Sequence, residues 1–212
     1  LPEGTTSGKD ILGFPLTHPN NGWLNLAGSD GVTGEYLFMN HKFDYTNFTI
    51  EGWVNPDTNG VIKHIFDGRD SSSDGVVVSI TAAEKFYWRI ADGSDSDQTS
   101  DSAYTGEWFY FACTYDGVTQ KMYVGTSTVA PILADAAITV SKQVSLTGTN
   151  GTFIGQSFTR TDQNFVGQLD EIRFYSRALT AFESDGSVPE TGETITSGEI
   201  LKNYKHGKSK HS

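Results

Sequence analysis

Carboxylates are the side chains of this 212-residue chain with the clearest capacity for chemistry, and their spacing does not suit catalysis. A retaining glycosidase needs two carboxyl groups about 5–5.5 Å apart, which on one strand means acids at positions such as i and i+4 of one face. Glu51 has no acidic partner in its predicted strand. Asp170 and Glu171 are adjacent, so we expect their side chains to point to opposite faces. The sequence therefore predicts no catalytic carboxylate pair.

Other nucleophile and metal patterns are also missing from the sequence. No serine stands in a Gly-x-Ser-x-Gly context, and the five histidines, at positions 18, 41, 64, 206 and 211, lack zinc-like spacing. Cys113 lies in an apolar run and is predicted to be a buried thiol. We therefore expect no catalytic residues, although these local patterns do not test a site assembled from distant strands.

Charge and composition exclude two classes of partner. The chain has 15 basic and 26 acidic residues, a net charge of −11, whereas a nucleic-acid-binding surface is usually basic. No apolar run approaches the ~20 residues of a membrane-spanning helix. We therefore expect neither a nucleic acid partner nor membrane insertion.

Short β-like runs separated by turn residues dominate the chain. Residues 48–54 alternate apolar and polar side chains, residues 75–80 are nearly all β-branched, and residues 108–115 form the strongest predicted strand. Residues 91–104 are rich in Asp and Ser and are predicted to be a long loop. The 23 glycines agree with many strands joined by turns. The pattern predicts an all-β fold, an antiparallel β-sandwich.

The run 167–175 is predicted to be a strand with four side chains on one face: Leu169, Glu171, Arg173 and Tyr175. On that face Glu171 and Arg173 are two residues apart, which predicts an ion pair on the strand surface. Trp53 and Trp108 are predicted to be core aromatics.

Composition and spacing divide the chain into one domain and a tail. We expect a single domain over residues 1–204, in which residues 179–196 form an inserted surface loop and residues 198–204 a short helix. Residues 205–212 read as a basic C-terminal tail. A solvated tail and a contact with an acidic partner surface are both open interpretations of this run.

Five motifs occur in one order along the chain. They are FTIEGWVNP at 48–56, GEWFYFACTYDG at 106–117, KMYVG at 121–125, FIG at 153–155 and FVGQLDEIRFYSRAL at 165–179. Together they resemble the laminin G-like domains of the concanavalin A-like lectin/glucanase superfamily. The resemblance covers roughly residues 22–204 and implies an antiparallel jelly-roll β-sandwich. It implies little about function, because this fold hosts many functions.

Laminin G-like relatives often carry one structural calcium ion, and the resemblance implies where it would bind. The aspartate of the LDEIRFY motif is Asp170, and the matching N-terminal loop contains Asp30. Calcium takes six to eight oxygen ligands, so both carboxylates are candidate metal ligands. The alternative is that Asp170 accepts a hydrogen bond from a backbone turn and that Asp30 is exposed.

Sugar sites in this fold commonly use rim loops or a sheet face, where aromatic rings stack on sugars and polar side chains read hydroxyl groups. The candidate loops are residues 67–74, 92–104 and 157–164. The candidate ligand-binding residues are Arg69, Asp70, Tyr104, Arg160 and Asn164.

The C-terminal run EILKNYKHGKSKH at 199–211 looks like the ends of laminin G-like domains in structural proteins of tailed phages, marine ones especially. The resemblance implies a non-catalytic virion protein, decorating the capsid or tail or serving in adhesion, and located on the virion. The expected partners are other virion subunits, further copies of this chain in a homo-oligomer, and cell-surface glycans. The alternative is a carbohydrate-binding module of a secreted bacterial enzyme or adhesin. A glycoside hydrolase or lyase is the third interpretation.

Overall fold

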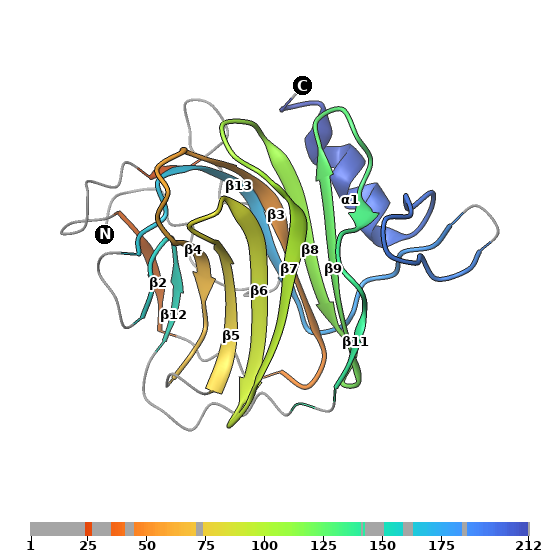
Figure 1. Ribbon diagram of the computed structural model, residues 1–212, viewed down its shortest axis with the longest axis horizontal. Coiled ribbons are helices and arrows are strands. Elements are labelled where there is room, and N and C mark those ends of the chain that lie inside the picture. The colour runs from red at the N-terminus through yellow and green to blue at the C-terminus, as the bar shows by residue number, and fades with distance from the viewer. Residues whose placement is uncertain are drawn as a thin grey trace.

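The computed structural model describes most of the chain. The described residues are 24–26, 35–40, 45–70, 74–140, 142, 151–158, 163–183 and 186–211. Within them seven strands form one sheet and six strands form a second, and every pairing between named strands is antiparallel. Figure 1 shows the two sheets as two layers.

The six-stranded sheet has the order β2-β12-β4-β5-β6-β7. Its strands are β2 (Leu37–Met39), β12 (Thr152–Ile154), β4 (Lys63–Asp67), β5 (Asp74–Ile80), β6 (Lys85–Asp92) and β7 (Asp95–Ala103).

The seven-stranded sheet has the order β1-β13-β3-β8-β9-β10, and β11 also pairs with β9. Its strands are β1 (Leu24–Leu26), β13 (Gly167–Tyr175), β3 (Phe48–Pro56), β8 (Phe109–Tyr115), β9 (Thr119–Thr126), β10 (Ile132–Leu133) and β11 (Ile138–Thr139). The predicted all-β antiparallel jelly-roll sandwich is confirmed.

Alternation along the strands directs one set of side chains into the space between the sheets. In β5, Val76, Val78 and Ile80 are fully buried in the main core, whereas Val77 and Ser79 belong to the opposite face. Cys113 is buried in the same core, and burial raises the pKa of its thiol well above the usual range. The thiol is buried, as predicted, and burial disfavours the reactive thiolate.

A second core lies on the outer face of the seven-stranded sheet. The chain after β13 and the helix α1 (Glu199–Lys208) cover that face, and Figure 1 shows α1 beside β9. The buried members are Trp53, Tyr110, Ala112, Tyr123, Leu133, Leu179, Ala181, Ile195, Ile200, Leu201 and Tyr204. The segment expected as an inserted surface loop thus supplies three buried side chains. Trp53 is a core aromatic, as predicted, and Trp108 packs against this core while partly exposed.

The basic C-terminal residues are docked on the protein. His211 stacks on Trp108 with ring centroids 4.0 Å apart and lies 4.9 Å from Trp53, and Lys210 pairs with Glu171. The His211 side chain is completely buried. Lys210 and His211 thus contact acidic residues of their own chain, so a fully solvated tail is wrong for His211, and contact with a partner surface stays a prediction.

A β-bulge in β13 corrects the predicted alternation. The register with β3 shifts between Asp170 and Arg173, and Glu171 has a left-handed φ of 53°. Because of the extra residue, Leu169 and Ile172 both join the main core, while Asp170 and Glu171 both reach the outer face. The expectation that Leu169 shares a face with Glu171, and that the two acids point apart, is wrong. The Glu171–Arg173 ion pair, at 2.6 Å, is confirmed.

The prediction of a loop over residues 91–104 is also wrong, because most of this segment forms β7. Its inward side chains are polar rather than apolar: Ser96, Gln98 and Ser100 are all buried. Gln98 Oε1 accepts a 2.7 Å hydrogen bond from the indole N–H of Trp88, which satisfies both groups inside the sandwich. A strand without inward apolar residues leaves no hydrophobic alternation to detect.

No helix within the described ranges is long and apolar enough to cross a membrane.

Candidate functional site

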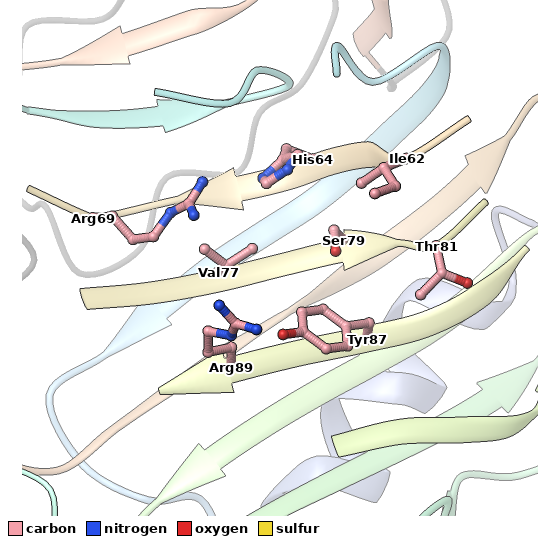
Figure 2. Close-up of a pocket in the computed structure, with 8 residues that line it drawn as sticks. All are labelled: Ile62, His64, Arg69, Val77, Ser79, Thr81, Tyr87 and Arg89. Atoms are coloured by element: carbon pink, nitrogen blue, oxygen red, sulfur yellow. The ribbon is translucent and has the colours of Figure 1, made fainter. Parts of the chain in front are cut away.

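A hollow of about 240 Å³ lies on the outer face of the six-stranded sheet. Its lining comes from β4, β5, β6 and the residues that follow or precede them: Ile62, His64, Arg69, Val77, Ser79, Thr81, Tyr87 and Arg89. Figure 2 shows the two arginines at one end, Ile62 and Thr81 at the other, and His64, Ser79 and Tyr87 between them. The hollow thus presents guanidinium groups, hydroxyl groups and an imidazole around aliphatic side chains.

Strand register places these side chains together. Directly paired residues of antiparallel strands point to the same face, so a cross-strand row is a row of neighbours. One row runs Asp67, Val77, Arg89, Asp97, and the next runs His64, Ser79, Tyr87, Thr99. The site is therefore fixed by backbone pairing rather than by a loop.

Arg69 is held in place by a buried carboxylate. Its Nε and Nη2 donate to Asp67 Oδ1 and Oδ2 at 2.9 and 2.6 Å, a bidentate arrangement. Asp67 is fully buried and also accepts a 2.9 Å hydrogen bond from the backbone N–H of Phe158. The Arg69 guanidinium therefore presents its remaining N–H groups from a fixed position.

Arg89, on β6, is also held by carboxylates. It donates to Asp97 through Nε and Nη2, at 2.8 and 3.1 Å, and its Nη1 lies 2.9 Å from Asp95 Oδ2. Two guanidinium groups are thus matched by three carboxylates, Asp67, Asp95 and Asp97. The site has no excess of positive charge.

The remaining titratable groups of the hollow are neutral at pH 7. Burial lowers the pKa of His64 to about 4, and the nearby Asp67 carboxylate offsets this only in part. His64 Nε2 is 3.1 Å from Gln163 Oε1. Burial also raises the pKa of Tyr87 far above its usual value, so its phenol stays protonated.

The depressed pKa of His64 predicts a pH-dependent stability. The unfolded chain takes up this proton below about pH 6.5, whereas the folded chain resists it until about pH 4. Stability is therefore lost as the pH falls through this window, by up to about 3 kcal/mol. Urea unfolding at pH 7 and pH 4.5 measures the loss, and His64→Gln should shrink the difference between the two values. An unchanged difference would show that His64 is not buried as described.

The sequence matches a family over most of its length. The family is Laminin_G_3, described as the concanavalin A-like lectin/glucanases superfamily, and the match spans residues 27–183. The chain belongs to this superfamily. No curated protein matches the chain significantly in sequence.

Solved structures share the superfamily's fold with this chain at low sequence identity. The Ruminococcus gnavus sialidase module CBM40 is 14% identical with a TM-score of 0.51, covering 69% of this chain and 92% of its own. Domain 4 of AbnA, an extracellular arabinanase of Geobacillus stearothermophilus, is 19% identical with a TM-score of 0.53, covering 76% and 80%. The binding domain of botulinum neurotoxin serotype D/C is 14% identical with a TM-score of 0.56, covering 80% of this chain and 44% of its own.

Within this superfamily fold, one of the predicted ligand-binding residues lines the hollow. Arg69 does so, and Asn164, which is buried, forms a bridge to His64 beside it. Asp70 lies outside the lining and bonds through its backbone N–H to Asp74 O at 3.3 Å. Tyr104 packs against Phe109, with ring centroids 5.0 Å apart. Arg160 lies outside the described residues.

Several lining residues were not among the sequence-based candidates, notably His64, Ser79, Tyr87 and Arg89. The sequence does indicate that two of them, Tyr87 and Arg89, face outward. They alternate with the apolar residues of one strand, which are Phe86, Trp88 and Ile90. Such alternation identifies outward-facing side chains, but which outward face lies open depends on long-range packing.

The described surroundings of Asp170 lack the oxygen-rich setting expected for the calcium ion that the superfamily resemblance implies. Asp170 is fully buried, its Oδ1 accepts the backbone N–H of Glu171 at 2.8 Å, and its Oδ2 faces His211 Nε2 at 3.2 Å. Among the described residues no group of three or more His, Cys, Asp or Glu side chains forms a metal cluster. Among the described residues, the groups placed against this carboxylate are a backbone N–H and an imidazole, whereas calcium takes oxygen ligands. Asp30 lies outside the described residues.

Proposed function

We propose that this chain is a non-catalytic glycan-binding domain whose ligand site is the hollow on the six-stranded sheet. The observation that carries the proposal is the lining itself. Fixed guanidinium groups and hydroxyl groups surround Val77 and Ile62, a combination suited to a sugar's hydroxyl groups and apolar face. None of the eight lining residues carries a carboxylate, and hydrolysis by the usual mechanism needs two.

The charges around the hollow indicate which class of sugar it binds. The two arginines are already neutralised by Asp67, Asp95 and Asp97, and the whole chain carries a net charge of −11. A sugar carboxylate would meet this acidic surface without an unpaired cation in the lining. The partly exposed Arg89 cluster with Asp95 and Asp97 instead offers donors and acceptors side by side, which match adjacent hydroxyl groups. We infer that the ligand is neutral.

The structural neighbours support binding of glycans in general. The CBM40 structures include complexes with α2,3 and α2,6 sialyllactose, which is acidic, and AbnA domain 4 was solved with arabinotriose, which is neutral. The balanced charges of this chain's site favour a ligand of the second kind.

Binding to a glycan array tests the proposal, and Arg89→Ala tests the site. The wild-type chain is expected to bind neutral oligosaccharides equally in calcium and in EDTA. Arg89→Ala removes a positioned donor and releases Asp95 and Asp97 into the site, so binding should weaken about tenfold or more. Arg177→Ala is the matched control, because Arg177 also pairs with a carboxylate, Glu199, but lies in the segment that follows β13 of the other sheet.

Three outcomes would contradict parts of the proposal. Binding only to acidic glycans would overturn the inferred charge preference. Equal affinity of the wild type and Arg89→Ala would place the ligand elsewhere. Binding that EDTA abolishes would require a calcium site outside the residues described.

Such a domain suits either of the two settings that the sequence suggests, a phage virion or a secreted bacterial enzyme or adhesin. We propose an extracellular or virion-surface location for it in both cases. The virion role and the homo-oligomer stay predictions. Neighbouring genes would separate the settings, and sedimentation would give the oligomeric state.

A further inference from the structure

Two aromatic side chains are unusually exposed at one edge of the six-stranded sheet. Tyr36 is 46% exposed and Phe38, in the edge strand β2, is 52% exposed. Both rings lie against Phe153 of β12, with centroids 5.8 and 5.0 Å away. Leaving a cluster of aromatic area in water is unfavourable, and a contiguous apolar patch marks a place where something binds. We name these three residues the aromatic platform.

The platform and the hollow lie on one face of the same sheet. Phe38 pairs with Phe153, Phe153 pairs with Asp67, and Asp67 pairs with Val77 of the hollow. Directly paired side chains share a face, so the platform and the hollow lie on the same outer face. Three strand spacings separate Phe38 from Val77, which is roughly 14 Å. A single sugar ring does not span that distance, but a short chain of sugars does.

The backbone beneath the platform makes room for its outer ring. A Cβ atom on Gly151 would lie 2.7 Å from Cε2 of Phe38, so only glycine allows this ring position. The ring is tilted by 50° against Phe153, which supports it from one side. Gly151 thus leaves room for the Phe38 ring, and Phe153 supports that ring from one side.

Polar groups connect the platform to the hollow. Asp67 follows Phe153 in the same cross-strand row and pairs with Arg69, whose guanidinium lies 5.8 Å from the centre of the Phe158 ring. The order across the face is thus aromatic rings, a bidentate ion pair and then the hollow. Apolar sugar faces and hydroxyl groups alternate in the same way along an oligosaccharide.

We propose that the aromatic platform is a second sugar subsite, and that the natural ligand is a neutral oligosaccharide lying across the strands from Phe38 to the hollow. This inference rests on the proposed function, because it extends the same site.

Calorimetric titration with neutral oligosaccharides of increasing length tests the platform. The probes are arabinose, xylose, cellulose and galactan fragments of one to six units. For the series that binds, wild-type affinity should rise once the chain is long enough to reach Phe38. Phe38→Ala should leave the affinity for the shortest ligand unchanged and weaken the longest roughly three- to tenfold, the loss of one stacked ring.

Two controls separate stacking from general damage. Phe38→Tyr keeps the ring and should retain the length-dependent gain. Val129→Ala changes another exposed apolar residue, 54% exposed and on the other side of the sandwich after β9, and should bind like the wild type.

The outcomes distinguish this inference from the function on which it rests. If Arg89→Ala loses binding while Phe38→Ala keeps the full gain with length, the platform is not a subsite and the hollow remains the site. If Phe38→Ala instead abolishes a dimer in sedimentation and leaves sugar affinity unchanged, the platform binds a second copy of the chain and the inference is overturned. If no fragment of any length binds the wild type, both fall.

Discussion

Replacing Glu51 by alanine is expected to lower the free energy of unfolding by about 3–5 kcal/mol. Glu51 is fully buried on β3, and its carboxylate accepts hydrogen bonds from the phenol of Tyr110 at 2.6 Å and from Asn203 Nδ2 at 2.9 Å. Arg173 and Tyr175 also donate to it, at 3.3 and 3.2 Å. Alanine leaves these buried donors, one of them charged, without their acceptor.

Glu51→Gln is the matched variant, because the amide keeps the shape and one acceptor oxygen. Burial raises the pKa of Glu51, and the hydrogen bonds from Tyr110 oppose this shift, so the site already carries a desolvation cost that a neutral amide avoids. Glu51→Gln should therefore lose clearly less stability than Glu51→Ala. Urea unfolding followed by tryptophan fluorescence measures both values. Equal, small losses would mean that Glu51 does not hold the sheet and helix together.

Replacing Tyr204 by alanine is expected to cost a similar amount, about 3–5 kcal/mol. Tyr204 anchors α1 in the second core: it is 2% exposed and stacks on Trp53, with ring centroids 5.4 Å apart. Its phenol donates to the backbone carbonyls of Thr126 and Val129, at 2.8 and 3.1 Å. Alanine would open a cavity over Trp53 and release the helix from the turn after β9.

Tyr204→Phe separates the two contributions. Phenylalanine keeps the stacked ring and loses only the hydroxyl group, so the expected loss is about 1 kcal/mol. The hydrogen-exchange rate of the α1 amides should rise in Tyr204→Ala and stay near the wild-type rate in Tyr204→Phe. Wild-type stability in Tyr204→Ala would show that the helix does not stabilise the sandwich.

The second core has a functional consequence. It closes the outer face of the seven-stranded sheet, together with the only helix in the described ranges. The acids brought together there, Glu51 and Glu171, share Arg173 and lie beneath α1 and the docked C-terminal residues. The outer face of the six-stranded sheet keeps its hollow and its exposed rings, so it is the face that we assign to ligand.

Local patterns predicted the fold well where strands are rich in apolar and β-branched residues. The strands around Trp53, Val78 and Phe111 have inward apolar residues, and the motifs in their order identified the superfamily. The pattern failed at β7, whose buried Gln98 is polar, and at the β13 bulge, where a left-handed Glu171 shifts the alternation by one residue. Both depend on partners far along the chain.

The candidate site was predictable only in part. Loop composition led to Arg69, which is a lining residue, but also to Tyr104, which packs against Phe109. The strand residues Tyr87 and Arg89 were missed because each sheet has an outward face, and sequence alone does not show which one the C-terminal segment covers. The same packing explains why His211 is buried although it follows a run of lysines.

The location of a bound sugar tests whether the hollow on the six-stranded sheet is the ligand site. A crystal structure of the chain with the strongest neutral oligosaccharide from the array would show that location. We expect density over Val77, Ser79 and Tyr87, with hydroxyl groups at the Arg69 and Arg89 ion pairs. A sugar bound at α1, or on loops away from the six-stranded sheet, would contradict this expectation.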